Sequence, residues 1–111
     1  MTERHWKGIA KADKADDYIK HLVDKTFPEL KKINGFISAI ILKRPVAAGM
    51  EFLVITTWDS LEAVSQFAGR NIDKAVVPDI VQELMIDFDE YVLHYDVVLN
   101  FNPGDEEKVV L

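Results

Sequence analysis

The stretch 51–69, EFLVITTWDSLEAVSQFAG, constrains the fold more than any other part of the chain. It begins with a run of branched and aromatic residues, which are typical of a packed β-strand. Successive side chains of a strand point to opposite faces, and both faces of this run are apolar. One face carries Phe52, Val54, Thr56 and Trp58, and the other carries Leu53, Ile55 and Thr57. A strand with one face in water would alternate apolar and polar residues, so we expect both faces to be covered.

The composition is that of one globular domain. The chain has 111 residues, of which 49% are hydrophobic and 29% charged. The net charge is −6 with acids and bases interspersed, so nucleic acid is not an expected partner, because binding phosphates requires clustered Lys and Arg. There is no cysteine, which excludes disulfides and thiolate chemistry. Neither a signal peptide nor a membrane-spanning run is visible, so we expect a cytoplasmic protein without a membrane partner.

The first half of the chain predicts a strand, two helical pieces and a hairpin. After a strand over 4–10, Asp13 is interpreted as the N-cap of an amphipathic helix. The apolar face of that helix consists of Ala15, Tyr18, Ile19, Leu22 and Val23. Pro28 is expected to end this helix, and capping-box spacing at Thr26 predicts a second one that Gly35 closes. Strands over 36–44 and 50–58, joined by a short loop, then predict an antiparallel hairpin.

The second half predicts two helices, a strand and an arm. Asp59 has capping-box spacing with Glu62, which predicts a short helix closed by Gly69. The segment 70–77 is ambiguous. Pro78 suits the first turn of a last helix. The remaining expectations are apolar helical positions at Ile80, Val81, Leu84, Met85 and Phe88, a strand over 91–99, and a C-terminal arm over 100–111.

The order strand, helix, strand, strand, helix, strand predicts an α+β fold of the ferredoxin-like βαββαβ type. We expect one domain over 1–99, with a four-stranded antiparallel sheet and both helices on one face. Right-handed crossovers place the first and third strands side by side in the middle. Leu53, Ile55 and part of 36–42 remain for the other face, and a patch of that size is rarely left in water. We therefore predict that a second copy of the chain covers it, forming a barrel-like homodimer.

An ordered set of residues points to a known family. The set comprises Arg4, Trp6 and Gly8; Tyr18; Gly35; Leu42 and Arg44; Phe52; Thr57, Trp58, Asp59 and Ser60; Phe67, Ala68 and Gly69; Ala75; and Val92, His94, Tyr95 and Val97. With these residues the chain resembles the antibiotic biosynthesis monooxygenase-like proteins of the dimeric α+β barrel superfamily, over about 4–99. The resemblance implies the dimeric α+β barrel more firmly than it implies a chemistry.

The resemblance implies two chemistries. Some members of the family oxidise aromatic polyketide phenols with O₂ and no cofactor. Others degrade haem with an Asn on the first strand, a Trp on the third and a His on the following helix. Trp58 matches that Trp, but 4–10 contains no Asn and 60–68 no His, so the iron would lack its proximal ligand. Haem degradation is therefore the less favoured reading, and no cofactor is expected.

His94, Trp58 and Arg44 are the candidate catalytic residues. An imidazole titrates near neutrality, so His94 could take a phenolic proton, with Asp96 two residues away to orient it. Trp58 could stack on a planar substrate, and Arg44 could bind a phenolate oxygen. Each has a structural alternative: a histidine bonded to a carbonyl or carboxylate, a core tryptophan, and a solvated or paired surface arginine.

The candidate substrate-binding residues are Arg4, Trp6, Tyr18, Phe67 and Tyr95. Arg4 could bind an anionic oxygen, the two tyrosines could donate hydrogen bonds, and Trp6 and Phe67 would shape the pocket. Surface arginines and core tyrosines are the alternatives. The histidines show no metal-ligand spacing, so no metal site is expected.

The sequence thus predicts a cofactor-independent monooxygenase-like protein that acts on a small aromatic or quinol-type substrate between sheet and helices. The alternative is a non-catalytic homodimeric module that uses the same pocket to bind a small hydrophobic ligand or a protein partner.

Overall fold

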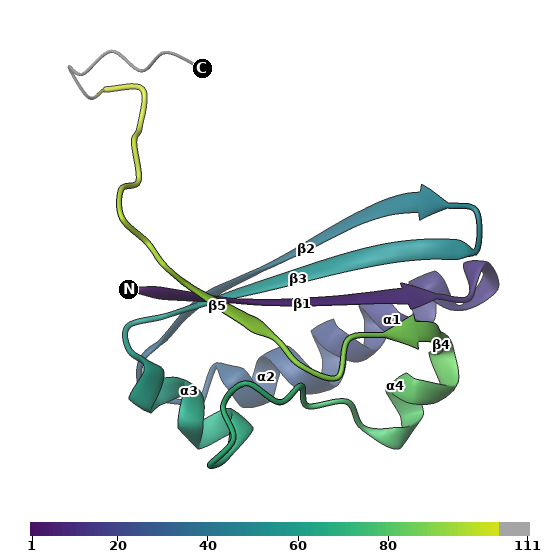
Figure 1. The fold of residues 1–111 in the computed structure, drawn as a ribbon, viewed down its shortest axis with the longest axis horizontal. Helices are drawn as coiled ribbons and strands as arrows, with labels where there is room; N and C mark the ends of the chain where they lie inside the picture. Colours follow the sequence, from purple (N-terminus) through teal and green to yellow (C-terminus); the bar gives the residue numbers. More distant parts are fainter. Residues whose placement is uncertain (105–111) are drawn as a thin grey trace.

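The computed structural model describes residues 1–104 and shows an antiparallel sheet with all its helices on one face (Figure 1). The elements are β1 (Thr2–Ala10), α1 (Ala15–His21), α2 (Phe27–Leu30), β2 (Phe36–Val46), β3 (Gly49–Trp58), α3 (Leu61–Ala68), α4 (Asp79–Leu84), β4 (Met85–Phe88) and β5 (Leu93–Asp96). This mixed α+β arrangement confirms the predicted fold class. No described helix is long and apolar enough to cross a membrane.

The sheet has the strand order β2-β3-β1-β4, and β5 also pairs with β1. β1 and β3 pair along their whole length, from Thr2 opposite Trp58 to Ala10 opposite Met50, which confirms that the first and third strands are neighbours. β2 and β3 form the predicted hairpin. The free edge of β1 is shared by two short strands, β4 near Ala10 and β5 near Thr2.

The end of the chain differs from the prediction in two places. The last helix stops at Leu84 instead of reaching Phe88, and residues 85–88 form β4. The strand predicted over 91–99 is limited to Leu93–Asp96. The edge of β1 explains the first difference, because its backbone groups need partners and the segment after α4 supplies them. The predicted arm is described only as far as Gly104, and its remainder lies outside the described residues.

The predicted break at Pro28 is wrong, because the helical path continues from α1 to α2 through a π-helical turn over Leu22–Thr26. A wider turn before Pro28 accommodates the missing N–H of proline without ending the helix. Neither predicted side-chain cap of this segment forms: Asp13 lies inside a 3₁₀ turn, and Thr26 makes no cap hydrogen bond. α3 does begin with a cap, but its donor bonds to the Oγ of Ser60 and not to Asp59.

The helices cover the sheet as two separate hydrophobic clusters. The larger lies under α1 and α4 and includes Phe52 and Val54 of β3. The smaller lies under α3 and consists of Leu30, Trp58, Ala63 and Val64. The face of β3 predicted to lie under the helices is buried as expected. A cavity lies along the boundary between the two clusters, since residues of both line it.

The opposite face of the sheet carries apolar side chains that no described helix covers. The register aligns Ile40, Ile55, His5 and Leu93 in one cross-strand row, and Leu42, Leu53 and Lys7 in the next. We call the five apolar residues of these rows the outer patch, in which His5 separates Leu93 from Ile55. Leu53 and Ile55 are half-buried, whereas Ile40, Leu42 and Leu93 are exposed by 50%, 48% and 62%.

Candidate functional site

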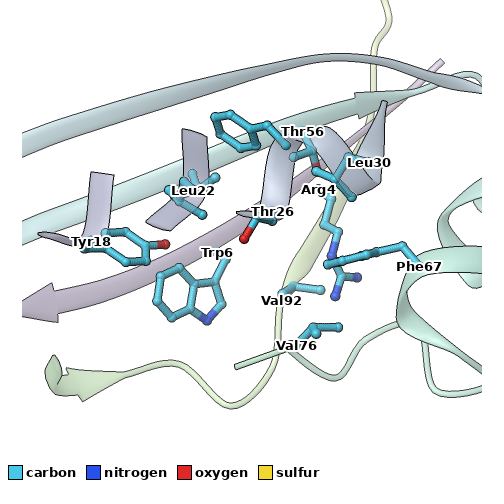
Figure 2. Close-up of a pocket in the computed structure, with 12 residues that line it drawn as sticks. Arg4, Trp6, Tyr18, Leu22, Thr26, Leu30, Thr56, Phe67, Val76 and Val92 are labelled. Carbon is cyan, nitrogen blue, oxygen red and sulfur yellow. The ribbon is translucent and has the colours of Figure 1, made fainter. Parts of the chain in front are cut away.

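A cavity of about 80 Å³ lies between the sheet and the helical layer, as Figure 2 shows. Its walls are mostly apolar, and four polar side chains face it: Arg4, Tyr18, Thr26 and Thr56. The apolar lining comes from the sheet, from the helical path and from the loops, and includes Trp6, Leu22, Phe27, Leu30, Val54, Phe67, Val76 and Val92. Among the described residues, those that line the cavity include no carboxylate and no histidine. An apolar pocket with a few convergent polar groups is typical of a small-molecule site.

Arg4 is the charged group of this cavity. It points from β1 toward the helices and is only 5% exposed. Its Nη1 donates to the backbone carbonyl of Ile72 and lies 3.1 Å from Nε2 of His94, and its Nη2 donates to the carbonyl of Lys74 at 2.9 Å. The guanidinium carbon lies 5.9 Å from the centre of the Phe67 ring. Nε and the second N–H of Nη2 have no acceptor among the described residues, so Arg4 can still donate to a ligand.

Burial destabilises the protonated form of Arg4, and the nearby carboxylate of Asp73 offsets only part of this destabilisation. The pKa of Arg4 is lowered to about 10, first because burial removes water from the guanidinium. Arg4 therefore keeps its charge at neutral pH. No carboxylate bonds to it directly among the described residues, because its partners are two carbonyls and an imidazole. A buried cation of this kind would be stabilised by an anionic ligand oxygen in the cavity.

The hydroxyl of Tyr18 also faces the cavity. Tyr18 is 2% exposed, and its ring packs edge-on against Phe52, with 4.9 Å between ring centres. Its hydroxyl has no hydrogen-bond partner among the described residues. Burial raises the pKa of Tyr18, so the hydroxyl stays protonated and can donate to a ligand. The hydroxyl of Thr26 is likewise unbonded, whereas Thr56 Oγ1 accepts from the Trp58 indole at 2.9 Å and keeps its own proton to donate.

The cavity adjoins an outer groove of about 230 Å³. Thr26, Phe67 and Val76 line both spaces, so they separate the cavity from the groove. The groove is completed by His21, Lys25, Glu29 and Pro78. Entry to the cavity thus lies between the π-helical turn and the loop over 70–78.

The structure brings together four of the five predicted substrate-binding residues, since Arg4, Trp6, Tyr18 and Phe67 all line the cavity. The fifth, Tyr95, lies on the outer face of the sheet with its ring 4.8 Å from that of His5. Its position gives it no contact with the cavity.

The three predicted catalytic residues do not line the cavity. Trp58 is fully buried behind it, stacks on Phe67 with 6.3 Å between ring centres, and donates to Thr56. Arg44 lies on the outer face, where it pairs with Glu51. His94 lies behind Arg4 and contacts the ligand space only through it. The carboxylate bonded to His94 is Asp73, at 3.3 Å, and not Asp96 as expected.

Several residues of the site escaped the sequence analysis. Thr56 could have been found from its place on the buried face of β3. Thr26 is predicted as a helix cap, but it lies on the π-helical turn and its side chain faces the cavity. Asp73 and the carbonyls of its two neighbours carry no sequence signal, because they reach Arg4 only through the path of the 70–78 loop. Within the described residues, no group of three or more His, Cys, Asp or Glu side chains could hold a metal ion.

Comparison with known proteins identifies the fold. No family model and no curated protein matches the chain. Among solved structures, a Deinococcus radiodurans protein provisionally named an antibiotic biosynthesis monooxygenase is 20% identical, with a TM-score of 0.67 over 92% of this chain and 97% of that one. The heme-degrader MhuD of Mycobacterium tuberculosis, with two hemes bound in its active site, is 21% identical with a TM-score of 0.62, over 92% of this chain and 100% of MhuD. A provisionally named monooxygenase of Chloroflexus aurantiacus is 18% identical with a TM-score of 0.62, over 93% and 98%. These likenesses confirm the predicted resemblance at the level of the fold.

Proposed function

We propose that this protein binds a small phenolic or quinol-type aromatic molecule in the cavity and promotes its oxidation by O₂ without a cofactor. The observation that carries the proposal is Arg4, a buried cation with free donors and no carboxylate bonded to it, in the wall of an apolar cavity. A charge-assisted hydrogen bond from Arg4 would favour the phenolate over the phenol. The names of proteins with the same fold support an oxygenase chemistry.

The other polar groups of the cavity fit the same ligand. Tyr18 would donate a second hydrogen bond to the oxygen that Arg4 holds, because its hydroxyl is protonated and unbonded. Trp6 and Phe67 would flank the ring as apolar walls. The cavity alone is small for an aromatic ring, so the ligand would extend into the groove past Thr26.

In this reaction the substrate supplies all the electrons. A hydroquinone gives two electrons and two protons to O₂ and becomes a quinone, with H₂O₂ as the second product. The anion of an anthrone-type substrate instead transfers electrons from a CH₂ carbon to O₂, and that carbon becomes a carbonyl. One oxygen atom forms the C=O bond and the other leaves as water with the two hydrogens of the CH₂ group. The protein contributes the stabilised anion and a mostly apolar lining.

Oxygen uptake with anthrone or hydroquinone tests the proposal. Wild-type protein is expected to accelerate uptake. Arg4→Lys should reduce kcat/KM on the order of 10- to 100-fold, since it removes a charge-assisted hydrogen bond of roughly 1.5–3 kcal/mol. Arg44→Lys is the matched control, because Arg44 lies on the other face of the sheet. Uptake that is absent in the wild type, or unchanged in Arg4→Lys, would refute the chemistry.

The alternative function is binding without turnover. One observation favours it. Among the described residues, no carboxylate or histidine lines the cavity to accept the substrate's proton. In that case a phenol would raise the melting temperature of the wild type and not of Arg4→Lys. Mass spectrometry would then show the ligand unchanged.

Haem fits this chain less well than a small phenol. The cavity of about 80 Å³ is small, and its described lining offers no histidine, cysteine or methionine to an iron. Tyr18 is the one lining side chain that could ligate iron as an anion, and burial raises its pKa, which disfavours that form. A hemin titration without a Soret shift would agree with this interpretation.

We also propose that two copies of the chain associate through the outer patch. The patch groups apolar side chains of β2 and β3 in adjoining rows, with Leu93 of β5 on the far side of His5, and exposed apolar patches mark protein interfaces. A two-fold pairing would cover the face that the helices leave open.

A further inference from the structure

We propose that His94 and Asp73 are positioning residues that aim the guanidinium of Arg4 into the cavity and hold the 70–78 loop closed over it. The inference deepens the proposed function, because the site that it concerns is the one that would bind the phenolate. It assigns His94 a structural task that differs from the predicted role as a general base.

The hydrogen-bond directions follow from the chemistry of the three groups. A guanidinium only donates, so the 3.1 Å contact between Arg4 Nη1 and His94 Nε2 requires a lone pair on Nε2. The proton of a neutral imidazole then resides on Nδ1, which lies 3.3 Å from the Oδ1 of Asp73 and donates to it. Asp73, His94 and Arg4 thus form a directed chain, in which the carboxylate selects the tautomer that can accept from Arg4.

The same arginine also fixes the loop. Arg4 donates to the carbonyls of Ile72 and Lys74, on either side of Asp73. Two residues further on, Val76 lines both the cavity and the outer groove. The orientation of Arg4 and the position of the loop at the cavity entrance are therefore set by one cluster of hydrogen bonds.

Protonation of His94 would disrupt this cluster. An imidazolium has an N–H on both nitrogens, so Nε2 would present a proton and a positive charge to Arg4. The charged groups that face His94 are Arg4 from β1 and Asp73 from the loop, and Asp96 lies two residues along its own strand. Burial and the charge of Arg4 lower the pKa of His94, and Asp73 only partly offsets them. The neutral, accepting form is thus present at neutral pH and is lost as the pH falls below the ordinary range of histidine.

The first test reads the tautomer directly and does not depend on any ligand. Nitrogen-15 NMR of the histidine side chains distinguishes a protonated Nδ1 from a protonated Nε2. We expect the Nδ1–H form of His94 in the wild type, and a measurable Nε2–H fraction in Asp73→Ala, where only Arg4 still favours the Nδ1–H form. Asp73 has a side chain that is 70% exposed, so this substitution should leave the fold intact. A wild type in the Nε2–H form would overturn the inference.

The second test compares the pH dependence of ligand affinity in wild type and His94→Gln. The glutamine amide oxygen can accept from Arg4 but does not titrate. We expect similar hydroquinone affinities near pH 7.5, measured by tryptophan fluorescence. In the wild type alone, binding should weaken as the pH falls below the lowered pKa of His94, by up to about 10-fold per pH unit. Because both proteins meet the same ligand, the ratio of their Kd values cancels any titration of hydroquinone. His5→Gln, on the opposite face of the sheet, should keep the wild-type profile.

The outcomes separate this inference from the proposed function. A pH-independent Kd ratio between wild type and His94→Gln would refute the positioning role while leaving phenol binding established. If hydroquinone binds to neither protein, the proposed function fails, and the NMR tautomer alone decides the inference. If His94→Gln keeps its affinity and loses all oxygen uptake, His94 is the base after all, and the positioning role is overturned.

Discussion

Arg4 and Arg44 carry the same guanidinium on opposite faces of one sheet, and their surroundings give them different chemistry. Arg4 is 5% exposed and bonds to two carbonyls and an imidazole, so its charge is only partly balanced. Arg44 has a side chain that is 70% exposed and pairs with the carboxylate of Glu51. An exposed pair is already satisfied and screened by water, whereas a buried cation without a carboxylate favours an anionic ligand. The difference favours Arg4 over Arg44 as the arginine of the candidate site.

The two faces of the sheet differ in the same way. Both are apolar along β3, but only the inner face is covered by this chain's own helices. The inner face therefore contributes to the stability of the monomer, and the outer patch is available for association. Substitutions that act on one face and not on the other separate these two contributions.

The largest expected effect is on the inner face. Trp58→Ala should lower the free energy of unfolding by about 3–5 kcal/mol, because it empties the centre of the cluster under α3. Thr57→Ala, one residue away and on the outer face, should cost less than about 1 kcal/mol. Urea unfolding followed by circular dichroism measures both. A cost for Trp58→Ala near that of Thr57→Ala would contradict the assignment of the core.

The second effect concerns the outer patch. Ile55→Glu places a charge at its centre, so the proposed dimer should dissociate while the monomer stays folded. Light scattering is expected to give twice the 12.6 kDa chain mass for the wild type and the chain mass for the variant. A monomeric wild type at micromolar concentration would refute the dimer, and an unfolded variant would assign the outer face to monomer stability.

The sequence predicted the fold more completely than the site, for physical reasons. The alternation along β3 and the hairpin are local patterns, and they placed Phe52 and Trp58 on the correct face. The π-helical turn before Pro28 depends on packing and leaves no local signature, so the helix break was predicted wrongly. The strand β4 was missed because residues 85–88 leave the predicted helix only where the edge of β1 is free to pair with them.

The site shows the same limit. Arg4, Trp6, Tyr18 and Phe67 line the cavity and belong to the set that carries the family resemblance, but so do Arg44 and Tyr95, which lie on the outer face. Asp73 was missed because its contact with His94 joins a loop and a strand distant in the chain, and no spacing rule relates them. Residue type alone could not distinguish Arg4 from Arg44, since they differ in burial and in partners.

The third effect is a matched pair of tyrosines. Tyr18→Phe removes a hydroxyl that has no protein partner among the described residues, so the free energy of unfolding should hardly change. Hydroquinone binding should weaken by roughly 3- to 10-fold, the equivalent of one neutral hydrogen bond of about 0.5–1.5 kcal/mol. Tyr95→Phe, on the outer face, should leave the affinity unchanged. Equal affinities of wild type and Tyr18→Phe would place the ligand elsewhere.

The smallest effect concerns Arg44 and the loss of stability at acidic pH. The hydrogen bond from Arg44, with its charge and that of Lys7, lowers the pKa of Glu51 below its usual value of 4.5, against a smaller opposing contribution from burial. A carboxyl whose pKa is lower in the folded state stabilises the fold above its unfolded pKa, and this contribution is lost as the pH falls through the folded pKa. Arg44→Gln should therefore have a slightly lower free energy of unfolding than the wild type near neutral pH. This difference between the two proteins should disappear below pH 4.5. Urea unfolding across this range at low and high salt measures the gap, which salt should also narrow. A gap that persists in acid would mean that Arg44 stabilises the hairpin by packing its aliphatic stem on β3, and not through its charge.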